Sequence, residues 1–467
     1  MAILARLGDA IWCPWMLGLF LLVGLYYSLR TGFFQLFSWK TWWKTTAGSL
    51  FCRKKRTIDG VSQLQALSTA LAATIGTGSI AGVATAVFFG GPGAVFWMWV
   101  SALLGMMTGC AEKTLAVRYR ERSTEGGWRG GPMCYIRDGL GCRWLAAVFS
   151  VLCVAQTLAG GNLVQANSIA VSLNSTFGVS KLAVGIVTAA LAGVVTLGGI
   201  GRIGKVSEKL VPAMAALFIG GGAVVLVTHA EAVPDALCDI VRYAFQPRAV
   251  IGGYSIGTAM RFGIARGVFT NEAGLGTSAI AHAAADVNDP AEQGMWGIFE
   301  VFAATIVVCS VTALVILTSG VYSVEGAQAA IRCGNIPEQM LGAPLTGSAF
   351  ATAFGRFGPV LVSTCLLLFA FTSLLGSCYY GQRGIEFLTG KSWVMNCYRG
   401  AYLAMIVLGC LGDVTAVWQL VDVIDGLLAL PNLTALLLLS PEAVRLIRVY
   451  SYKKQAGHGY SLLLGKK

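Results

Sequence analysis

Long apolar stretches recur along almost the whole chain of 467 residues, and they constrain the fold more than any other feature of the sequence. Hydrophobic residues make up 56% of the chain and charged residues only 12%, which is about half of the charged fraction of a soluble domain. An α-helix needs about 20 apolar residues to cross the hydrocarbon core of a bilayer. The chain is therefore predicted to be an all-α integral membrane protein that crosses the lipid bilayer many times.

The sequence predicts about 11 membrane helices, judged by the length that a span requires. Their expected bounds are 11–30, 62–90, 93–117, 144–175, 181–200, 206–229, 250–283, 294–319, 358–388, 397–412 and 414–440. The stretch 33–50 mixes Trp and Phe with Lys, which makes it too polar for a span. It is predicted to lie flat in the membrane interface.

Arginine and lysine residues gather in alternate loops between the predicted helices. These loops are 31–61, which holds the cluster at 53–56, then 118–143, 202–209, 383–399 and the tail 441–467. Because loops rich in these residues stay in the cytoplasm, the N-terminus is predicted outside the cell membrane and the C-terminus in the cytoplasm. The loop 284–293 is an exception, since it has acidic residues and no Lys or Arg, but acidic residues carry little weight in this rule. The loops also explain the net charge of +12, so no nucleic-acid partner is predicted.

A glycine-rich run, Gly-Thr-Gly-Ser-Ile-Ala-Gly at 76–82, lies in the middle of the predicted helix 62–90. At membrane depth, non-helical backbone is tolerated only inside protein or beside a wet cavity. Many transporters bind their substrate and coupling ion at helices broken in this way. A second such run lies at 263–276. Two broken helices, one in each half of the chain, indicate a transporter built from two repeats.

Other classes of function lack their signatures in the sequence. The three histidines are scattered, which argues against a metal site or an enzyme with catalytic residues. No rings of like charge suggest a channel. Residues 199–204 match the pattern GxGxxG, but they lie between apolar helices, whereas a dinucleotide site needs a preceding strand. The chain is therefore not predicted to be an enzyme, and no cofactor is expected beyond a coupling ion.

Several long motifs resemble the alanine or glycine:cation symporter family, also called sodium:alanine symporters. They read LSTALAATIGTGSIAGVATAVFFGGPGAVFWMW at 67–99, RGVFTNEAGLGTSAIAHAAA at 266–285 and FTSLLGSCYYGQRGIEFL at 371–388. The resemblance covers about 60–440 and implies the leucine-transporter architecture, in which one N-terminal helix precedes two inverted five-helix repeats with broken first helices. The implied units are 1–61 with the N-terminal helix and interfacial segment, 62–229 and 250–440 as repeats, and 441–467 as a cytoplasmic tail.

The first broken helix is predicted to hold the substrate. The N-terminus of a half-helix favours an anion such as a carboxylate, and the glycines let the backbone approach it closely. The resemblance implies that Phe269 covers the substrate and that polar side chains on the helix 144–175 face the cavity. The predicted substrate-binding residues are Gly76, Thr77, Gly78, Ser79, Asn162, Gln165, Phe269, Thr270, Asn271 and Ser377.

A sodium site is implied at the hydroxyl pair Thr372-Ser373 on the helix 358–388. The expected carbonyl ligands are those of Ala72, Ile75 and Phe369, since hard cations favour oxygen. The alternative is that both hydroxyls bond back to the preceding helical turn, which Ser and Thr often do in membrane helices.

The resemblance implies sodium-coupled symport of a small neutral amino acid by alternating access. A proton-coupled carrier of the same fold is the alternative, with Glu272 or Glu112 carrying the proton. Glu272 could instead balance Arg261 or Arg266 structurally, since ionisable groups at this depth need a role or a partner.

Three positions differ from the usual family residues. Ser79 stands in place of Asn, Ala304 in place of Asp, and Ser377 in place of Trp. Serine is much smaller than tryptophan, so the sequence predicts a substrate pocket larger than is usual in the family.

Overall fold

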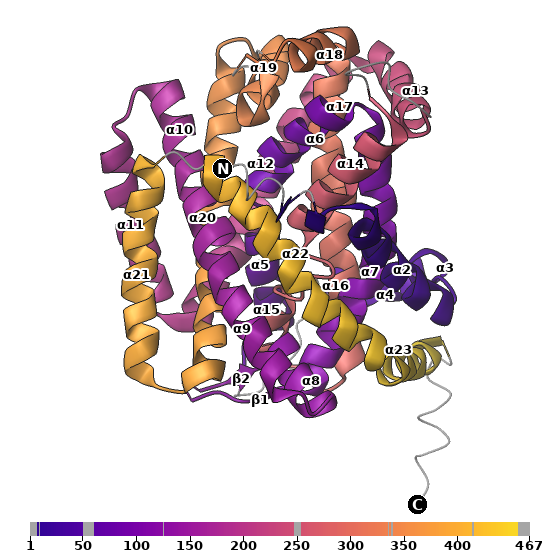
Figure 1. Ribbon diagram of the computed structural model, residues 1–467, viewed down its shortest axis with the longest axis vertical. Coiled ribbons are helices and arrows are strands. Elements are labelled where there is room, and N and C mark those ends of the chain that lie inside the picture. The colour runs from indigo at the N-terminus through magenta and orange to yellow at the C-terminus, as the bar shows by residue number, and fades with distance from the viewer. Residues whose placement is uncertain are drawn as a thin grey trace, which may run out of the picture.

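The computed structural model describes residues 7–8, 10–49, 60–124, 126–246, 254–334, 336–337, 340–412 and 415–455. Almost all of the described chain is helical, and its two strands form one antiparallel hairpin, in which β1 (Glu121–Arg122) pairs with β2 (Trp128–Arg129). The long helices stand side by side in a bundle (Figure 1). The predicted all-α fold class is confirmed.

Within the described residues, seven helices are long and apolar enough to cross a membrane, or eight if one bent pair counts as a single span. They are α7 (Gly93–Arg118), the run of α9 (Arg143–Leu158), η3 (Ala159–Val164) and α10 (Gln165–Phe177), α12 (Gly199–Thr228), the run of α16 (Pro290–Val301), η5 (Phe302–Cys309) and α17 (Ser310–Thr318), α20 (Phe357–Thr389), α21 (Ser392–Leu411) and most of α22 (Thr415–Leu438). Two shorter apolar helices are α2 (Pro14–Arg30) and α11 (Lys181–Thr196). The figure of about 11 spans, the inverted repeats and the units 1–61, 62–229, 250–440 and 441–467 stay predictions.

One predicted boundary is wrong. Helices are expected at 181–200 and 206–229, but α11 ends at Thr196 and α12 begins at Gly199. Arg202 and Lys205, which suggest a loop by their charge, lie in the first turns of α12 with exposed side chains. Arginine and lysine are good helix formers. A cluster of them therefore interrupts the apolar sequence but can form the first turns of the next helix.

The first predicted break is present. Helix α5 (Gln63–Thr74) ends at Thr74, and the chain resumes with the π-helical turn η2 (Gly78–Gly82) and α6 (Val83–Gly90). The two halves are bent by 50° relative to each other. Only Ile75 and Gly76 leave the helix, so Thr77 to Gly82 are helical, unlike the expectation for the whole run 76–82.

The second break lies further along the chain than the predicted 263–276. Helix α14 (Ile256–Asn271) is continuous to Asn271, and the chain unwinds until α15 (Ala279–Ala283). Gly263 and Gly267 serve close packing and not unwinding, because a Cβ atom at these positions would lie 2.2 Å from the carbonyl oxygen of Ala94 and 2.8 Å from the hydroxyl of Ser101. Small residues at such contacts let helix backbones approach closely.

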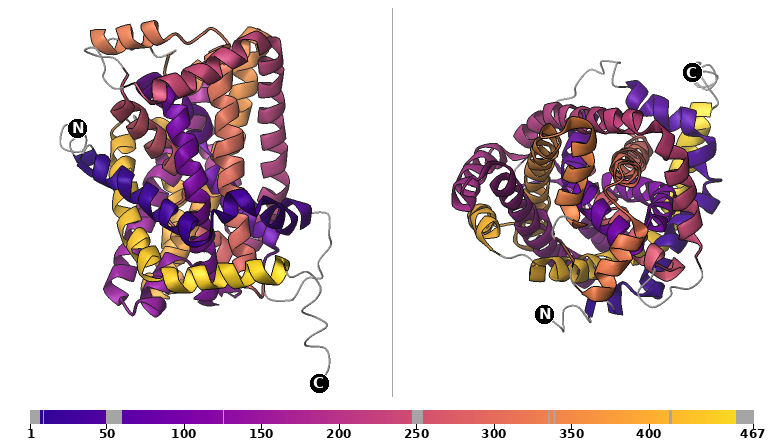
Figure 2. Two further views of the ribbon diagram at one scale, coloured as in Figure 1. Left: turned by 90° about the vertical axis from the view of Figure 1, so that its right-hand side faces the viewer. Right: turned by 90° about the horizontal axis from the view of Figure 1, so that it is seen from above.

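Short elements cover the two ends of the bundle (Figures 1 and 2). At one end lie η4 (Ala230–Ala232), α13 (Val233–Ala244), α18 (Val324–Cys333) and α19 (Gly342–Phe354). At the other end lie α8 (Pro132–Gly139), the hairpin and α23 (Ser440–Gln455), which crosses the base of the bundle at a large angle to α22.

The predicted interfacial stretch 33–50 does not span the bundle. It forms α3 (Phe34–Phe37), α4 (Trp39–Thr45) and the 3₁₀ turn η1 (Ala47–Ser49) at the side of the bundle. Phe37 and Trp39 have exposed side chains, as expected for an amphipathic segment in a membrane interface. The basic cluster at 53–56, the start of the predicted span 250–283, the start of 414–440 and the tail beyond 455 lie outside the described residues.

Candidate functional site

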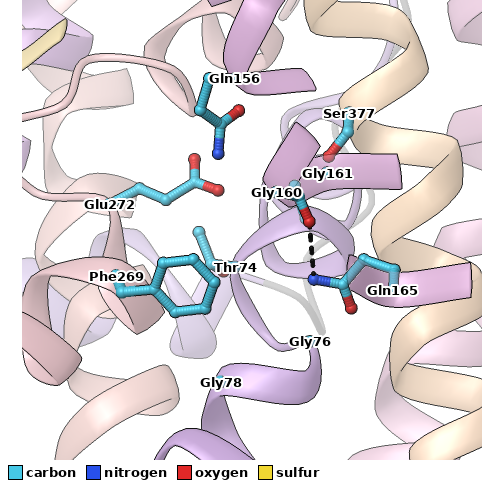
Figure 3. Close-up of a pocket in the computed structure, with 11 residues that line it drawn as sticks. Thr74, Gly76, Gly78, Gln156, Gly160, Gly161, Gln165, Phe269, Glu272 and Ser377 are labelled. Carbon is cyan, nitrogen blue, oxygen red and sulfur yellow. Dashed lines mark hydrogen bonds between the residues drawn. The ribbon is translucent and has the colours of Figure 1, made fainter. Parts of the chain in front are cut away.

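A small cavity lies beside the first broken helix, inside the bundle. Its walls come from α5 and η2, from α9, η3 and α10, from α14 and from α20 (Figure 3). It is lined by Ala73, Thr74, Gly76, Gly78, Gln156, Gly160, Gly161, Gln165, Phe269, Glu272 and Ser377. The structure therefore brings together five predicted substrate residues, namely Gly76, Gly78, Gln165, Phe269 and Ser377.

Helix α20 approaches the broken helix closely because Gly376 has no side chain. A Cβ atom at Gly376 would lie 2.9 Å from the Cβ atom of Ala73 and 3.0 Å from the carbonyl oxygen of Thr69. This contact places Ser373, about one turn before Gly376, against the end of α5, and Ser377, the next residue, at the cavity.

The side chain of Gln165 links the first break to the run of α9, η3 and α10. Its Oε1 atom accepts a hydrogen bond from the backbone N–H of Thr77 at 3.2 Å, and its Nε2 atom donates to the carbonyl oxygen of Gly160 at 3.3 Å (Figure 3). The N–H groups at the start of a helix have no partner within the helix. The start of η2 therefore presents N–H donors to the cavity, and Gln165 already uses one of them.

Phe269 forms one wall of the cavity at the last turn of α14. Its ring centroid lies 5.6 Å from that of Trp418 on α22. The guanidinium of Arg266 lies 5.9 Å from the ring centroid of Phe269 and 5.7 Å from that of Trp418. Arg266 also forms an ion pair with Asp422 at 3.1 Å. Phe269 thus belongs to a layer of aromatic and ionic contacts between α14 and α22 at the cavity.

The other predicted substrate residues do not line the cavity. Asn162 donates to the carbonyl oxygen of Tyr402 at 2.8 Å. The Thr270 hydroxyl bonds back to Arg266, and the Asn271 amide donates to Thr305 at 3.2 Å.

Thr77 and Ser79 are buried in the first broken helix. The carbonyl oxygen of Ser79 accepts from the Thr312 hydroxyl at 2.7 Å. Both residues therefore join the broken helix to its surroundings, and neither is among the cavity-lining residues.

The implied sodium ligands are all buried. Ser373 donates to the carbonyl oxygens of Ala72 and Ala73 at 3.0 and 2.9 Å, so its hydroxyl lies against the C-terminal end of α5. Thr372 donates to the carbonyl oxygen of Phe369 at 3.0 Å, which is the back-bonded arrangement. Ile75 is the C-cap residue of α5. Carbonyls at a helix C-terminus favour a cation, and this end also carries the neighbouring hydroxyls.

Two polar residues of the cavity, Gln156 and Glu272, are absent from the predicted substrate set. Gln156 lies in a long apolar helix, where one amide looks like any isolated polar residue. Glu272 does not balance Arg266, which pairs with Asp422, and its Oε2 atom accepts from the Thr277 hydroxyl at 2.5 Å. In the sequence, the position of Glu272 next to the glycines of the second break is the signal that indicates a place at the cavity.

A second group of charges is fully buried below the cavity, between α7, α15 and α16. The Nζ atom of Lys113 lies 3.5 Å from Glu112 and 3.4 Å from Glu300. His282 contacts Glu300 at 3.0 Å, and Gln293 contacts His282 at 2.7 Å. These contacts join the short helix α15 to α7 and α16.

The sequence profile of the sodium:alanine symporter family matches residues 1–462. The chain belongs to this family. Its members are transporters and not enzymes, and several apolar helices agree with a multi-pass membrane protein.

Members of the sodium:alanine symporter family match this chain over most of its length. The sodium/alanine symporter AgcS of Methanococcus maripaludis is 39% identical over 435 residues, which is 92% of both chains. The probable sodium/glutamine symporter GlnT of Bacillus subtilis is 34% identical over 449 residues, 96% of this chain and 90% of that one.

The fold is also similar to that of a solved membrane transporter. A crystal structure of the Eremococcus coleocola manganese transporter superposes with a TM-score of 0.54 at 14% identity, covering 83% of this chain and 78% of that one. At this identity the likeness concerns the fold alone.

Proposed function

We propose that the protein is a sodium-coupled secondary active symporter of small neutral amino acids. The observation that carries the proposal is the meeting of the broken helix with α20, where Ser373 lies against the carbonyls of Ala72 and Ala73 beside the cavity. The names of its relatives AgcS and GlnT support amino acids as the substrate class and sodium as the coupling ion.

The substrate would bind with its carboxylate at the start of η2. The backbone at Gly76 and Gly78 lines the cavity, and the N–H groups at a helix start favour an anion. Gln165 sits at the same place and can exchange its contact with Thr77 for one with the substrate carboxylate, since its amide carries both donors and an acceptor.

Sodium would bind between the C-terminal end of α5 and α20. The ligands would be the carbonyl oxygens of Ala72, Ile75 and Phe369 and the hydroxyls of Thr372 and Ser373. This set consists of oxygen only, as hard cations prefer. Because Ala72 lies before the break and Gly78 after it, ion and substrate would stabilise the same arrangement of the helix halves. Coupling of this kind is typically worth about 1–3 kcal/mol.

Alternating access would open and close the layer above the cavity. The ring of Phe269 contacts that of Trp418, and Arg266 pairs with Asp422. All four residues belong to α14 and α22, so movement of one helix relative to the other would break both contacts together. The protein would lie in the cell membrane with its N-terminus outside and its C-terminus in the cytoplasm.

Proton coupling is the second candidate, and the buried group of Lys113, Glu112, Glu300 and His282 favours it. Ionisable residues inside a membrane domain often belong to proton pathways. Glu272 lines the cavity close to this group and could carry the proton.

Uptake of radiolabelled L-alanine into proteoliposomes distinguishes sodium coupling from proton coupling. An inward sodium gradient should drive uptake at constant pH, and Ser373→Ala should weaken the dependence on sodium at least tenfold. Ser363→Ala is the matched control, because Ser363 lies on the same helix and its hydroxyl contacts Thr176 instead. Uptake that follows a pH gradient in sodium-free buffer would establish proton coupling.

A further inference from the structure

Glu272 holds an unusual position at the cavity. It is the C-cap residue of α14 and has a left-handed backbone conformation, with φ of 54°. Such a conformation is strained for a residue with a side chain, and strained residues cluster at functional sites. Its side chain is buried, and it lines the cavity.

The carboxylate of Glu272 forms no direct ion pair with a described residue. The nearby Arg266 pairs with Asp422 at 3.1 Å, and Lys113 lies between Glu112 and Glu300 at 3.5 and 3.4 Å. The Thr277 hydroxyl donates to Oε2 of Glu272 at 2.5 Å. A buried charge without a partner is costly, so a positively charged group at this place would be strongly stabilised.

The cavity has two chemically different ends. Figure 3 shows the Glu272 carboxylate pointing into the cavity toward the Gln156 amide, while the backbone of Gly76 and Gly78 lies at the opposite end. One end therefore offers a carboxylate acceptor, and the other offers N–H donors at a helix start. An amino acid in its zwitterionic form matches this polarity, with its carboxylate at the glycines and its ammonium at Glu272.

We infer that Glu272 binds the α-ammonium group of the transported amino acid. This inference rests on the proposed function and names a contact within its substrate site. It makes the charge of the amino group, and not only the size of the side chain, a condition for transport. A 2-hydroxy acid of the same shape lacks this charge and would be rejected, because the carboxylate would stay buried without a partner.

The test compares L-alanine with 2-hydroxypropanoate, which differs only in a hydroxyl in place of the ammonium. Both compounds are offered to proteoliposomes under a sodium gradient. The protein as it exists should prefer alanine at least a hundredfold in kcat/KM. Glu272→Gln should raise the KM for alanine at least tenfold and reduce this preference below tenfold. The glutamine keeps an oxygen that can accept from Thr277, so the local hydrogen bond survives.

Two controls separate the inference from effects on folding and from the ion site. Glu231→Gln removes an exposed glutamate at the end of the bundle and should change neither KM nor preference. Stabilisation of the detergent-solubilised protein against heat by sodium should be kept in Glu272→Gln. If that variant does not fold, Glu272→Asp decides, because it keeps the charge and should keep the preference for alanine although its KM rises.

Several outcomes contradict the inference. An unchanged preference in Glu272→Gln, or a lost preference in a folded Glu272→Asp, shows that the ammonium binds elsewhere. A Glu272→Gln protein with normal KM that no longer responds to a pH gradient would identify Glu272 as a proton carrier. If the unaltered protein transports no amino acid under a sodium gradient, the proposed function fails first and the inference falls with it.

Discussion

At the scale of single residues, Lys113 shows how the interior holds charge. It is fully buried and lies between Glu112 and Glu300, and Glu112 also accepts hydrogen bonds from the Gly274 N–H at 2.8 Å and the Asn432 amide at 2.7 Å. Gly274 belongs to the second break. The lysine thus neutralises the carboxylate that anchors the unwound segment to α7.

Replacement of Lys113 by alanine should therefore be severe. Removing one partner of a buried ion pair typically costs about 3–5 kcal/mol, because the other charge stays buried. We expect the free energy of unfolding in detergent to fall by about this amount. Lys205→Ala removes an exposed lysine and should change it by less than about 0.5 kcal/mol. Equal stability of the two variants would show that Lys113 is not required to balance the glutamates.

The contact between Gly161 and Ser377 sets the width of the cavity at one wall. A Cβ atom at Gly161 would lie 2.4 Å from the Cβ and Oγ atoms of Ser377. Gly161→Ala should therefore narrow the cavity, raise the KM for alanine several-fold and destabilise the protein by about 1–3 kcal/mol.

The double variant Gly161→Ala with Ser377→Gly should recover most of both losses, since neighbouring sites are not additive. Gly400→Ala is the control, because nothing lies within 4 Å of a Cβ atom there. If the second change rescues neither KM nor stability, Ser377 does not define this wall.

Part of the site could be predicted from sequence and part could not. Gly76, Gly78 and Ser377 belong to long motifs, and the two glycines flank Thr77 inside an apolar stretch. Gln156 is one amide in an apolar helix, and no local signal separates a cavity wall from a helix contact. Asn162 illustrates the converse, because its amide contacts the backbone of α21 and not the cavity.

At the scale of elements, the two broken helices are stabilised differently. The first break has no positive φ among its described residues and is hydrogen-bonded at Thr77 by the Gln165 side chain, whereas the second contains two glycines with positive φ, Gly274 and Gly276. A Cβ atom at Gly276 would lie 2.4 Å from Pro132 and 2.9 Å from Asn432. The second break is therefore fixed by tight packing against α8 and α22.

We expect Gly276→Ala to destabilise the protein more than Gly178→Ala. Both glycines have positive φ, 80° and 67°, but a Cβ atom at Gly178 meets nothing within 4 Å. The left-handed conformation costs each alanine about 1–2 kcal/mol, and overpacking adds about 1–3 kcal/mol at Gly276 alone. Thermal unfolding in detergent measures both. Similar losses in the two variants would mean that the segment moves aside to make room.

The position of the second break also shows why the sequence predicts it too close to the N-terminus. Gly263 and Gly267 look like helix breakers, yet they pack α14 against α7. The sequence does not distinguish a glycine that unwinds a helix from one that allows close packing, because the difference lies in the neighbouring helix. Similarly, α19 is rich in small residues and was not expected, since its helix depends on burying Leu345 and Phe350 against other elements.

At the scale of the whole molecule, the basic loops and the predicted orientation are open to a direct test. The natural residue Cys238 is exposed on α13, at the end of the bundle opposite to α23. If the N-terminus is outside, Cys238 faces the outside of the cell.

We expect a variant with Cys238 as its sole cysteine to react with an impermeant maleimide on intact cells. Lys391→Cys in a cysteine-free background, an exposed position between α20 and α21, should react only after the membrane is opened. The opposite pattern would reverse the orientation, and the positive-inside prediction would be wrong.

Within the part of the chain that the structure describes, three long helical runs each contain a π-helical stretch, and these stretches lie at the cavity or next to it. Gly78 of η2 and Gly160 and Gly161 of η3 line it, while η5 contacts η2. A π-helical turn carries more residues than an α-helical turn and is often found at functional sites. Each run therefore has additional residues in a turn at the cavity or next to it. Tightening any of these turns to an α-helical turn would rotate and shift the half-helix beyond it while leaving the other half in place. The helices would then bend next to the proposed substrate site.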